Sequence, residues 1–338
     1  MSKQEKIKNY NPSSVGIDNG NIFGLPFNFE ESNIVILPVP WEVTTSFGDG
    51  TSKGPQAILE ASPQLDLYHS DFPEAWKQGI FMLDSSTEIL QLNKQMKSKA
   101  KEIILLLEKG KSSDSLQKEI NTINEACTFM NRWVFEQVNT LIKRGKKVIL
   151  LGGDHSTPLG AINAFSQHHE AFGILQIDAH ADLRNAYEGF EYSHASITFN
   201  ALKNKAVKSV TQVGIRDICE EEVQLINQSE NIFCFYDEQL KRERFNGKTW
   251  HQQIQEVIAT LPDKVYITFD IDALDPKLCP NTGTPVPGGL EFHEAIEIIR
   301  QVKLSGKTII GCDLNEVGNH EWDANVGARV LYQLCCYL

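Results

Sequence analysis

Aspartate and histidine residues occur at a regular two-residue spacing in two short segments of the chain. Asp178, His180 and Asp182 form the segment DAHAD, and Asp270 and Asp272 begin the segment DIDALDP. In an extended chain, residues at positions i, i+2 and i+4 point to the same side. The spacing therefore predicts that each segment directs its carboxylates and imidazole toward one place, as a metal site requires.

A further histidine, His155, completes the set of candidate ligands, because it follows an apolar segment within the motif GGDHS. Four clustered carboxylates without counter-charge cost several kcal/mol, so two divalent cations are the natural partners. Oxygen ligands dominate and thiolates are missing from the set, a composition that favours Mn²⁺ over Zn²⁺. Two such ions activate water, and the predicted chemistry is hydrolysis.

Short apolar segments precede these motifs and predict the strands that position them. Strands are expected at 33–39, 147–151, 172–177, 209–213, 232–236, 265–269 and 308–311. Strands that are apolar throughout and separated by helices predict a parallel sheet covered on both faces. Ligands of such sheets bind at the carboxyl ends of the strands, so the motifs should meet at one edge.

The rest of the chain suggests a simple domain organisation. Residues 1–30 are polar and without clear periodicity, which predicts an irregular N-terminal extension. Residues 31–338 fit a single α/β domain. Within it, residues 87–117 surround one apolar patch with Lys, Ser and Gln and predict a peripheral, largely helical insertion. Another helix is expected at 121–144, before Gly145.

Composition limits the partners of the protein. The 338 residues include 32 Lys and Arg against 44 Asp and Glu, a net charge of −12. This charge disfavours nucleic acid and anionic membranes and favours a cationic ligand. No apolar stretch approaches the length of a membrane span, and the seven cysteines form no C-x-x-C pair. We therefore expect a cytoplasmic protein that binds neither membrane nor nucleic acid.

Five motifs give the chain a resemblance to a known family. GGDHS, DAHADLR, SHAS, DIDALDP followed by GTPVPGGL, and DLNEV occur in the order and approximate spacing of the ureohydrolase superfamily, which includes arginases and agmatinases. The resemblance covers most of residues 33–338. It implies a three-layer α/β/α fold with a central, mainly parallel sheet, and a homo-oligomer, either a trimer or a hexamer. It also implies two Mn²⁺ per subunit and hydrolysis of a guanidino group to urea and an amine.

The same resemblance implies a ligand set for each of the two ions. One ion would be held by His155, Asp178, Asp182 and Asp270, and the other by Asp178, His180, Asp270 and Asp272. Asp178 and Asp270 would then bridge the pair.

Three residues would carry the reaction if the resemblance holds. Asp182 would steady the attacking water. His194, in SHAS, matches the family histidine that shuttles protons, which suits the protonation of a departing amine. Glu316, in DLNEV, matches the family acid that pairs with the substrate guanidinium, as a carboxylate is suited to do.

The loop after DAHAD bears on the choice of substrate. Arginases carry there an Asn and a Ser that recognise an α-carboxylate, whereas Arg184 and Asn185 stand here as candidate substrate-binding residues. The loop looks more like that of bacterial agmatinases, whose substrate ends in a second cation that Glu188, Glu191 or 220–222 can meet. Agmatine, converted to putrescine and urea, is therefore the predicted substrate. Arginine, guanidine and a guanidino acid that pairs with Arg184 are the alternatives.

Two other classes of protein are compatible with parts of the pattern. Deacetylases of related fold also place Asp and His at strand ends but use a single zinc ion, whereas the paired aspartates and Glu316 favour two metals and a cationic substrate. A protein that only senses a ligand is disfavoured because all six ligand positions are filled.

Overall fold

The computed structural model describes all of residues 1–338 and is organised around one parallel sheet of eight strands. The strands are β1 (Ile34–Val39), β2 (Ile80–Met82), β3 (Lys147–Gly152), β4 (Phe172–Ile177), β5 (Val207–Ile215), β6 (Ile232–Tyr236), β7 (Lys264–Asp270) and β8 (Thr308–Asn315). Their order across the sheet is β2-β1-β3-β8-β7-β4-β5-β6, and every neighbouring pair is parallel.

Eleven α-helices surround this sheet. They are α1 (Lys3–Asn9), α2 (Gly54–Ala61), α3 (Thr87–Glu108), α4 (Gln117–Lys143), α5 (Leu159–Phe165), α6 (Ile197–Leu202), α7 (Glu220–Gln228), α8 (Asp237–Phe245), α9 (Trp250–Ala259), α10 (Phe292–Leu304) and α11 (Glu321–Tyr337). None of them is long and apolar enough to cross a membrane.

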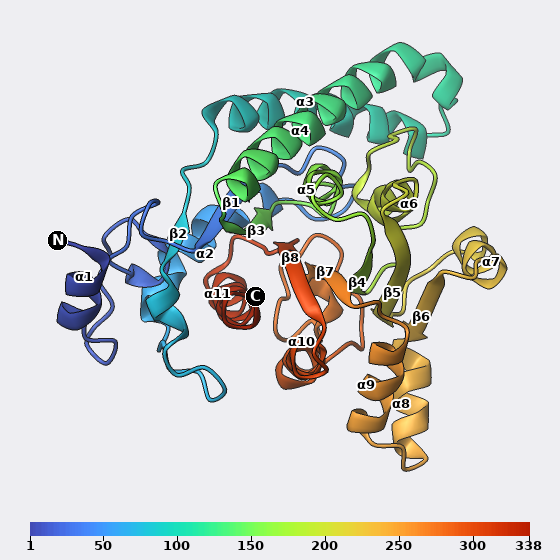
Figure 1. Cartoon of the computed structure of the whole chain (residues 1–338). Helices are drawn as coiled ribbons and strands as arrows, with labels where there is room; N and C mark the ends of the chain where they lie inside the picture. Colours follow the sequence, from blue (N-terminus) through green and yellow to red (C-terminus); the bar gives the residue numbers. More distant parts are fainter.

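The sheet separates two hydrophobic clusters. Ile34 and Ile36 of β1 lie in one cluster and Val35 and Leu37 in the other, because successive side chains of a strand point to opposite faces. The first cluster contains side chains of α2 and α8–α11, and the second contains side chains of α3–α6. Figure 1 shows these two groups of helices on opposite sides of the sheet. The predicted three-layer α/β/α architecture is therefore confirmed.

All seven expected strands are present, and the differences lie at short or polar segments. Strand β2 was missed because it has only three residues, although its Ile80 pairs with Ile34 of β1. Strand β8 continues past the expected end at residue 311 to Asn315, with Asp313 and Asn315 both buried. A strand prediction that depends on runs of apolar residues stops at the first buried polar residue, so it places the end of such a strand too early.

The N-terminal segment is more ordered than the expected irregular extension. Helix α1 begins at a capping box formed by Ser2 and Glu5. Ile22 and Phe23 are buried in the first hydrophobic cluster. One turn or two of polar helix gives too few residues for a periodic signal, which explains why the sequence did not indicate α1.

The segment expected as an insertion contains α3 and the start of α4. Helix α3 buries Ile89, Met96 and Ala100 in the second hydrophobic cluster. Figure 1 shows α3 alongside α4 on the outer side of that layer.

Candidate metal centre

The predicted ligands follow four strands that are neighbours in the sheet. Strands β3, β8, β7 and β4 are consecutive, and their carboxyl ends lie at one edge. His155 follows β3, residues 178–182 follow β4, Asp270 ends β7 just before Asp272, and Glu316 follows β8. The topology thus brings together residues up to 161 positions apart in the chain.

Three carboxylates converge on one nitrogen of His155. Its Nδ1 lies 2.9 Å from Oδ2 of Asp178, 3.1 Å from Oδ2 of Asp182 and 3.2 Å from Oδ2 of Asp270. This nitrogen nevertheless has no hydrogen-bond partner of acceptable geometry, whereas Nε2 lies 2.8 Å from Oγ1 of Thr268. All four ligand candidates are buried. The contact of Nε2 with Thr268 fixes the orientation of the imidazole, and Nδ1 faces three carboxylates. This arrangement is suited to binding a cation between them.

A second group lies beside the first. Nδ1 of His180 is 3.0 Å from Oδ2 of Asp272 and 3.7 Å from Oδ1 of Asp178. Oδ2 of Asp272 is buried and has no hydrogen-bond partner. Asp178 belongs to both groups, as the sequence suggested for a bridging ligand, whereas Asp270 falls within ligand distance of the first group only.

The loop 178–182 reaches both groups because it is not extended. Strand β4 ends at Ile177, and Asp182 has a left-handed backbone with φ of 54°. Gln176 anchors the turn by donating from Nε2 to Oδ2 of Asp178 at 2.8 Å and to the carbonyl of His180 at 3.1 Å. The prediction that these residues share one face of an extended segment is therefore wrong, although the expected side chains still converge.

Arg216 of the motif GIRD braces the neighbouring loop. Its guanidinium donates to the carbonyl oxygens of Asp272 at 2.6 Å, Leu274 at 3.2 Å and Val286 at 3.0 Å. These bonds fix the backbone that follows β7. Arg216 thus supports Asp272 from outside the ligand groups.

Burial and mutual repulsion disfavour ionised carboxylates at this site. Burial, with the charge of Asp178, raises the pKa of Asp182 to about 7. Burial, with Asp272 and Asp178, also raises the pKa of Asp270 well above its usual value. Burial acts in the same direction on Asp178, but the proximity of the His155 and His180 imidazoles outweighs it and lowers that pKa. Crowded carboxylates and unpartnered ligand atoms together fit divalent cations, which supply the missing positive charge.

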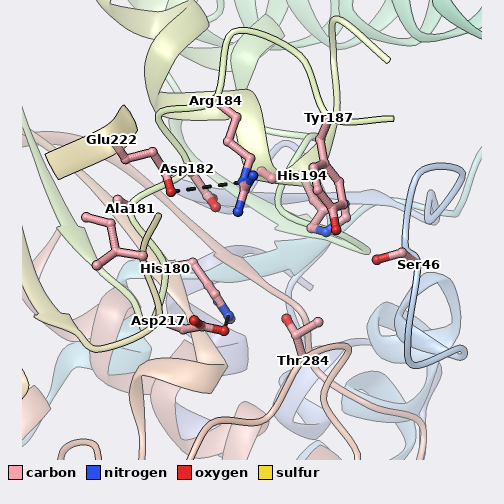
Figure 2. A pocket seen from close by; sticks show the side chains of 12 residues that line it. Ser46, His180, Ala181, Asp182, Arg184, Tyr187, His194, Asp217, Glu222 and Thr284 are labelled. Atoms are coloured by element: carbon pink, nitrogen blue, oxygen red, sulfur yellow. Dashed lines mark ion pairs between the residues drawn. The ribbon is translucent and has the colours of Figure 1, made fainter. Parts of the chain in front are cut away.

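A cavity of about 140 Å³ adjoins the candidate centre. Figure 2 shows that side chains from separate parts of the chain surround it, including Ser46 from the loop after β1 and Thr284 from the loop after β7. Its carboxylate, guanidinium and imidazole groups come from His180, Asp182, Arg184, His194, Asp217 and Glu222.

Arg184, Tyr187 and His194 form one wall of this cavity. The Arg184 guanidinium lies 4.9 Å from the centre of the Tyr187 ring, and its Nε is 3.9 Å from Oε2 of Glu222 (Figure 2). The Tyr187 ring meets the His194 ring edge-on at 6.2 Å. Burial, together with the positive charge of His180, lowers the pKa of His194 to about 3.

Glu316 lies behind the cavity lining rather than in it. Its Oε1 accepts a hydrogen bond from the backbone N–H of His155 at 2.9 Å, and its Oε2 is buried without a partner. A Cβ at Gly283 would stand 2.7 Å from that oxygen, so glycine keeps the space beside it open. Burial, with the charge of Asp154, raises the pKa of Glu316. A cationic donor at Oε2 would satisfy this carboxylate.

Several candidate residues are not brought to the cavity. Asn185 is exposed and does not line it, and Glu191 and Glu220 are exposed as well. In contrast, Glu222 is buried, and its Oε1 accepts from the backbone N–H of Leu183 at 2.9 Å.

Sequence reasoning did not single out four lining residues, Ser46, Tyr187, Asp217 and Thr284. Two of them carried a usable signal. Asp217 belongs to the motif GIRD at the end of β5, and Ser46 lies in the loop that follows the first strand. Thr284 lies within the motif GTPVPGGL but was not singled out there, and Tyr187 had no distinguishing pattern.

Comparison with known proteins places this chain in a family. The sequence profile of the Arginase family matches residues 32–337. The chain is 30% identical over 294 residues to N(1)-aminopropylagmatine ureohydrolase of Synechocystis, covering 86% of this chain and 83% of that protein. It is 27% identical to guanidinobutyrase of Pseudomonas aeruginosa, covering 93% and 88%. Agmatine ureohydrolase of Thermoplasma volcanium has the same fold, with a TM-score of 0.69, 21% identity and coverage of 99% and 97%.

The chain therefore belongs to the arginase family. It is a ureohydrolase, a hydrolase that acts on guanidino C–N bonds. The predicted family and class of enzyme are both confirmed.

Proposed function

We propose that the protein hydrolyses agmatine to putrescine and urea and uses two Mn²⁺ per subunit. The observation that carries the proposal is the pair of ligand groups that share Asp178, with the unpartnered Oε2 of Glu316 beside them. The first feature suits a pair of divalent cations, and the second suits a guanidinium group.

In this proposal one ion would be held by His155, Asp178, Asp182 and Asp270. The other would be held by Asp178, His180 and Asp272, with Asp270 as the fourth ligand that the family resemblance implies. Bound there, the ions would supply an activated water nucleophile and positive charge near the reacting carbon. Oxygen ligands outnumber nitrogen ligands in both groups, which supports Mn²⁺ as the native metal.

Three side chains of the protein act on the substrate in the proposed reaction. Glu316 accepts N–H groups of the guanidinium through Oε2 and thereby orients its central carbon. Asp182 accepts a hydrogen bond from the attacking water. His194 passes a proton to the leaving amine, a role consistent with its place in the cavity wall.

The charges of the cavity favour a substrate whose tail ends in a cation. Asp217 and Glu222 contribute two carboxylates to the lining, against one guanidinium from Arg184. The side chain of Asp217 is 70% exposed, which leaves it free to meet an ammonium group. Agmatine carries such a group at its far end. The name of the Synechocystis relative extends the candidates to N(1)-aminopropylagmatine, a longer polyamine.

A second candidate is a guanidino acid such as 4-guanidinobutyrate. The Arg184 guanidinium lies over the Tyr187 ring and has one ion pair, the 3.9 Å pair with Glu222, so it is available to a substrate carboxylate. The printed name of the Pseudomonas aeruginosa relative agrees with this candidate.

A substrate panel tests these proposals. Urea release would be measured with Mn²⁺-loaded enzyme on agmatine, N(1)-aminopropylagmatine, 4-guanidinobutyrate, L-arginine and guanidine. The highest kcat/KM is expected with agmatine. A clear preference for 4-guanidinobutyrate would assign the Arg184 wall to carboxylate recognition and overturn the choice of agmatine.

Assembly and location belong to the same proposal. We propose a homo-oligomer in the cytoplasm that binds neither nucleic acid nor membrane. All seven cysteines are unpaired, which supports a reducing compartment. The net charge of −12 supports small cationic ligands over polyanions.

A further inference from the structure

Two polar side chains of α3 are buried against the loop that follows β1. Asn93 and Lys97 lie one helical turn apart and are only 7% and 8% exposed. Oδ1 of Asn93 accepts a hydrogen bond from the backbone N–H of Glu42 at 2.8 Å. Nζ of Lys97 donates to the carbonyl oxygen of Thr45 at 3.0 Å and also to its Oγ1. Helix α3 thus holds the loop at two points, on either side of Thr44.

The ion pair of Lys97 fixes a third point of the same loop. Its Nζ lies 3.2 Å from Oδ1 of Asp49, which also pairs with Lys101 from the next turn of α3. A buried ammonium group is costly unless its donors are satisfied. Lys97 therefore has little freedom to leave this arrangement while the loop stays in place.

The residue between the two clamped points contacts His194. Oγ1 of Thr44 lies 3.3 Å from Nδ1 of His194 and accepts from the backbone N–H of His194 at 3.2 Å. Thr44 is fully buried, and its Oγ1 is also 3.5 Å from Oδ2 of Asp154. Ser193 Oγ lies 3.4 Å from the same ring nitrogen, but Thr44 contacts both the backbone and the ring of His194 and thereby contributes to the orientation of both.

We propose that Lys97 and Asn93 are positioning residues for His194. They hold the segment 42–45 so that Thr44 keeps the imidazole aimed into the cavity. Neither residue lines the cavity that contains His194, so both act through the loop. The role of His194 as proton donor to the leaving amine comes from the proposed function, and this inference rests on it.

The consequence for catalysis follows from the geometry of proton transfer. A general acid must lie within hydrogen-bond reach of the atom that it protonates. A displacement of about 1 Å in a catalytic group lowers a rate by up to about 100-fold. Loss of the clamp should therefore lower kcat, while substrate binding through Glu316 is retained.

Two variants break the connection at different points. Lys97→Met keeps the length of the side chain but removes its three polar contacts, and Thr44→Val keeps the shape of the hydroxyl residue but removes both contacts to His194. Lys94→Met is the matched control, because Lys94 is exposed on the same helix. Each variant would be combined with His194→Asn, and metal content would be measured in all of them.

Kinetics and amide hydrogen exchange give separate readouts. We expect Lys97→Met and Thr44→Val to lower kcat about 10-fold or more with KM and metal content little changed, and Lys94→Met to match the wild type. In the His194→Asn background, Lys97→Met should cause no further loss of kcat. In Lys97→Met, exchange should rise in both segments 42–50 and 193–196.

Two results would overturn the positioning role. One is a loss of kcat from Lys97→Met that persists undiminished in the His194→Asn background. The other is faster exchange in 42–50 with no change in 193–196. Wild-type enzyme without activity on any guanidino compound would instead contradict the proposed function, and the exchange experiment would still decide whether the clamp reaches His194.

Discussion

The backbone N–H of His155 donates a 2.9 Å hydrogen bond to Oε1 of Glu316. This bond joins the candidate metal centre directly to the candidate guanidinium site. It also directs the other oxygen of Glu316 away from the backbone, where it is buried without a partner. The Glu316 carboxylate is thus hydrogen-bonded to the backbone of the metal-ligand candidate His155 through one oxygen. Its other oxygen remains available to accept a hydrogen bond from the substrate.

The substitution Glu316→Gln tests this division of labour. Glutamine can still accept from the His155 N–H but lacks the negative charge that attracts a guanidinium. The loss of one charged hydrogen bond, about 3 kcal/mol, should lower kcat/KM for agmatine about 100-fold. Metal content, measured by mass spectrometry, should not change. Glu191→Gln at an exposed position is the control, and an unaltered kcat/KM in Glu316→Gln would refute the assignment.

The shared position of Asp178 predicts unequal effects of two ligand substitutions. Asp178 belongs to both ligand groups and Asp272 to one. Asp178→Asn should therefore release both ions, whereas Asp272→Asn should retain close to one ion per chain. Metal would be counted after gel filtration, with Asp275→Asn at a surface ion pair as the control. Full occupancy in Asp178→Asn would contradict the predicted sharing.

The raised pKa of Asp182 predicts that metal affinity depends on pH. This pKa is about 7 because of burial and the charge of Asp178. Below that pH a proton occupies the carboxylate and must leave when a cation binds, so affinity should fall as the pH drops from about 8 to 6. The limit is about tenfold per pH unit for each proton released. Calorimetry in buffers of different ionisation enthalpy measures this release, and affinity that is constant over the range would disprove it.

The Arg184 wall predicts a change in substrate preference. Arg184→Gln removes the one cation of the cavity lining apart from its histidines. Activity on 4-guanidinobutyrate should fall about 10-fold or more, because a charged pair with the carboxylate is lost. Activity on agmatine should stay the same or rise. Steady-state kinetics on both substrates provide the check, and equal losses on the two would show that Arg184 is structural.

The hydrogen bonds of Arg216 predict that its substitution lowers the stability of the fold and does not act directly on the catalytic step. Its guanidinium donates to the backbone carbonyl oxygen of Gly214 in β5 and to several carbonyl oxygens of the segment after β7. Lysine offers a single ammonium group and leaves some of these oxygens unpaired. Arg216→Lys should lower the free energy of unfolding by about 2 to 4 kcal/mol. Urea denaturation would be compared with that of Arg242→Lys at an exposed position of α8, and indistinguishable midpoints would contradict the bracing role.

Patterns that depend on burial were readable from the sequence. The seven longer strands were marked by apolar runs such as the one in β4, and the polar motifs after them marked the edge of the sheet where ligands gather. This succeeded because parallel strands are buried on both faces and end at one functional edge. Strand β2 and helix α1 were missed because each is short and one of them is polar.

The course of the backbone between motif residues was not readable. The segment 178–182 was expected to be extended, but the backbone of Asp182 is left-handed and Gln176 donates to the Asp178 carboxylate within the loop. Contacts between distant segments were equally hidden. Lys97 was one lysine among several in a polar stretch, and its contact with Thr45 depends on the packing of α3 against the loop after β1. No local spacing encodes such a contact.

Urea formation from agmatine during stepwise addition of Mn²⁺ to metal-free protein tests the central claim most directly. The proposed function predicts no urea without metal and a rate that reaches its plateau at two ions per chain. A plateau at one ion per chain, or metal binding without urea from agmatine, would contradict it.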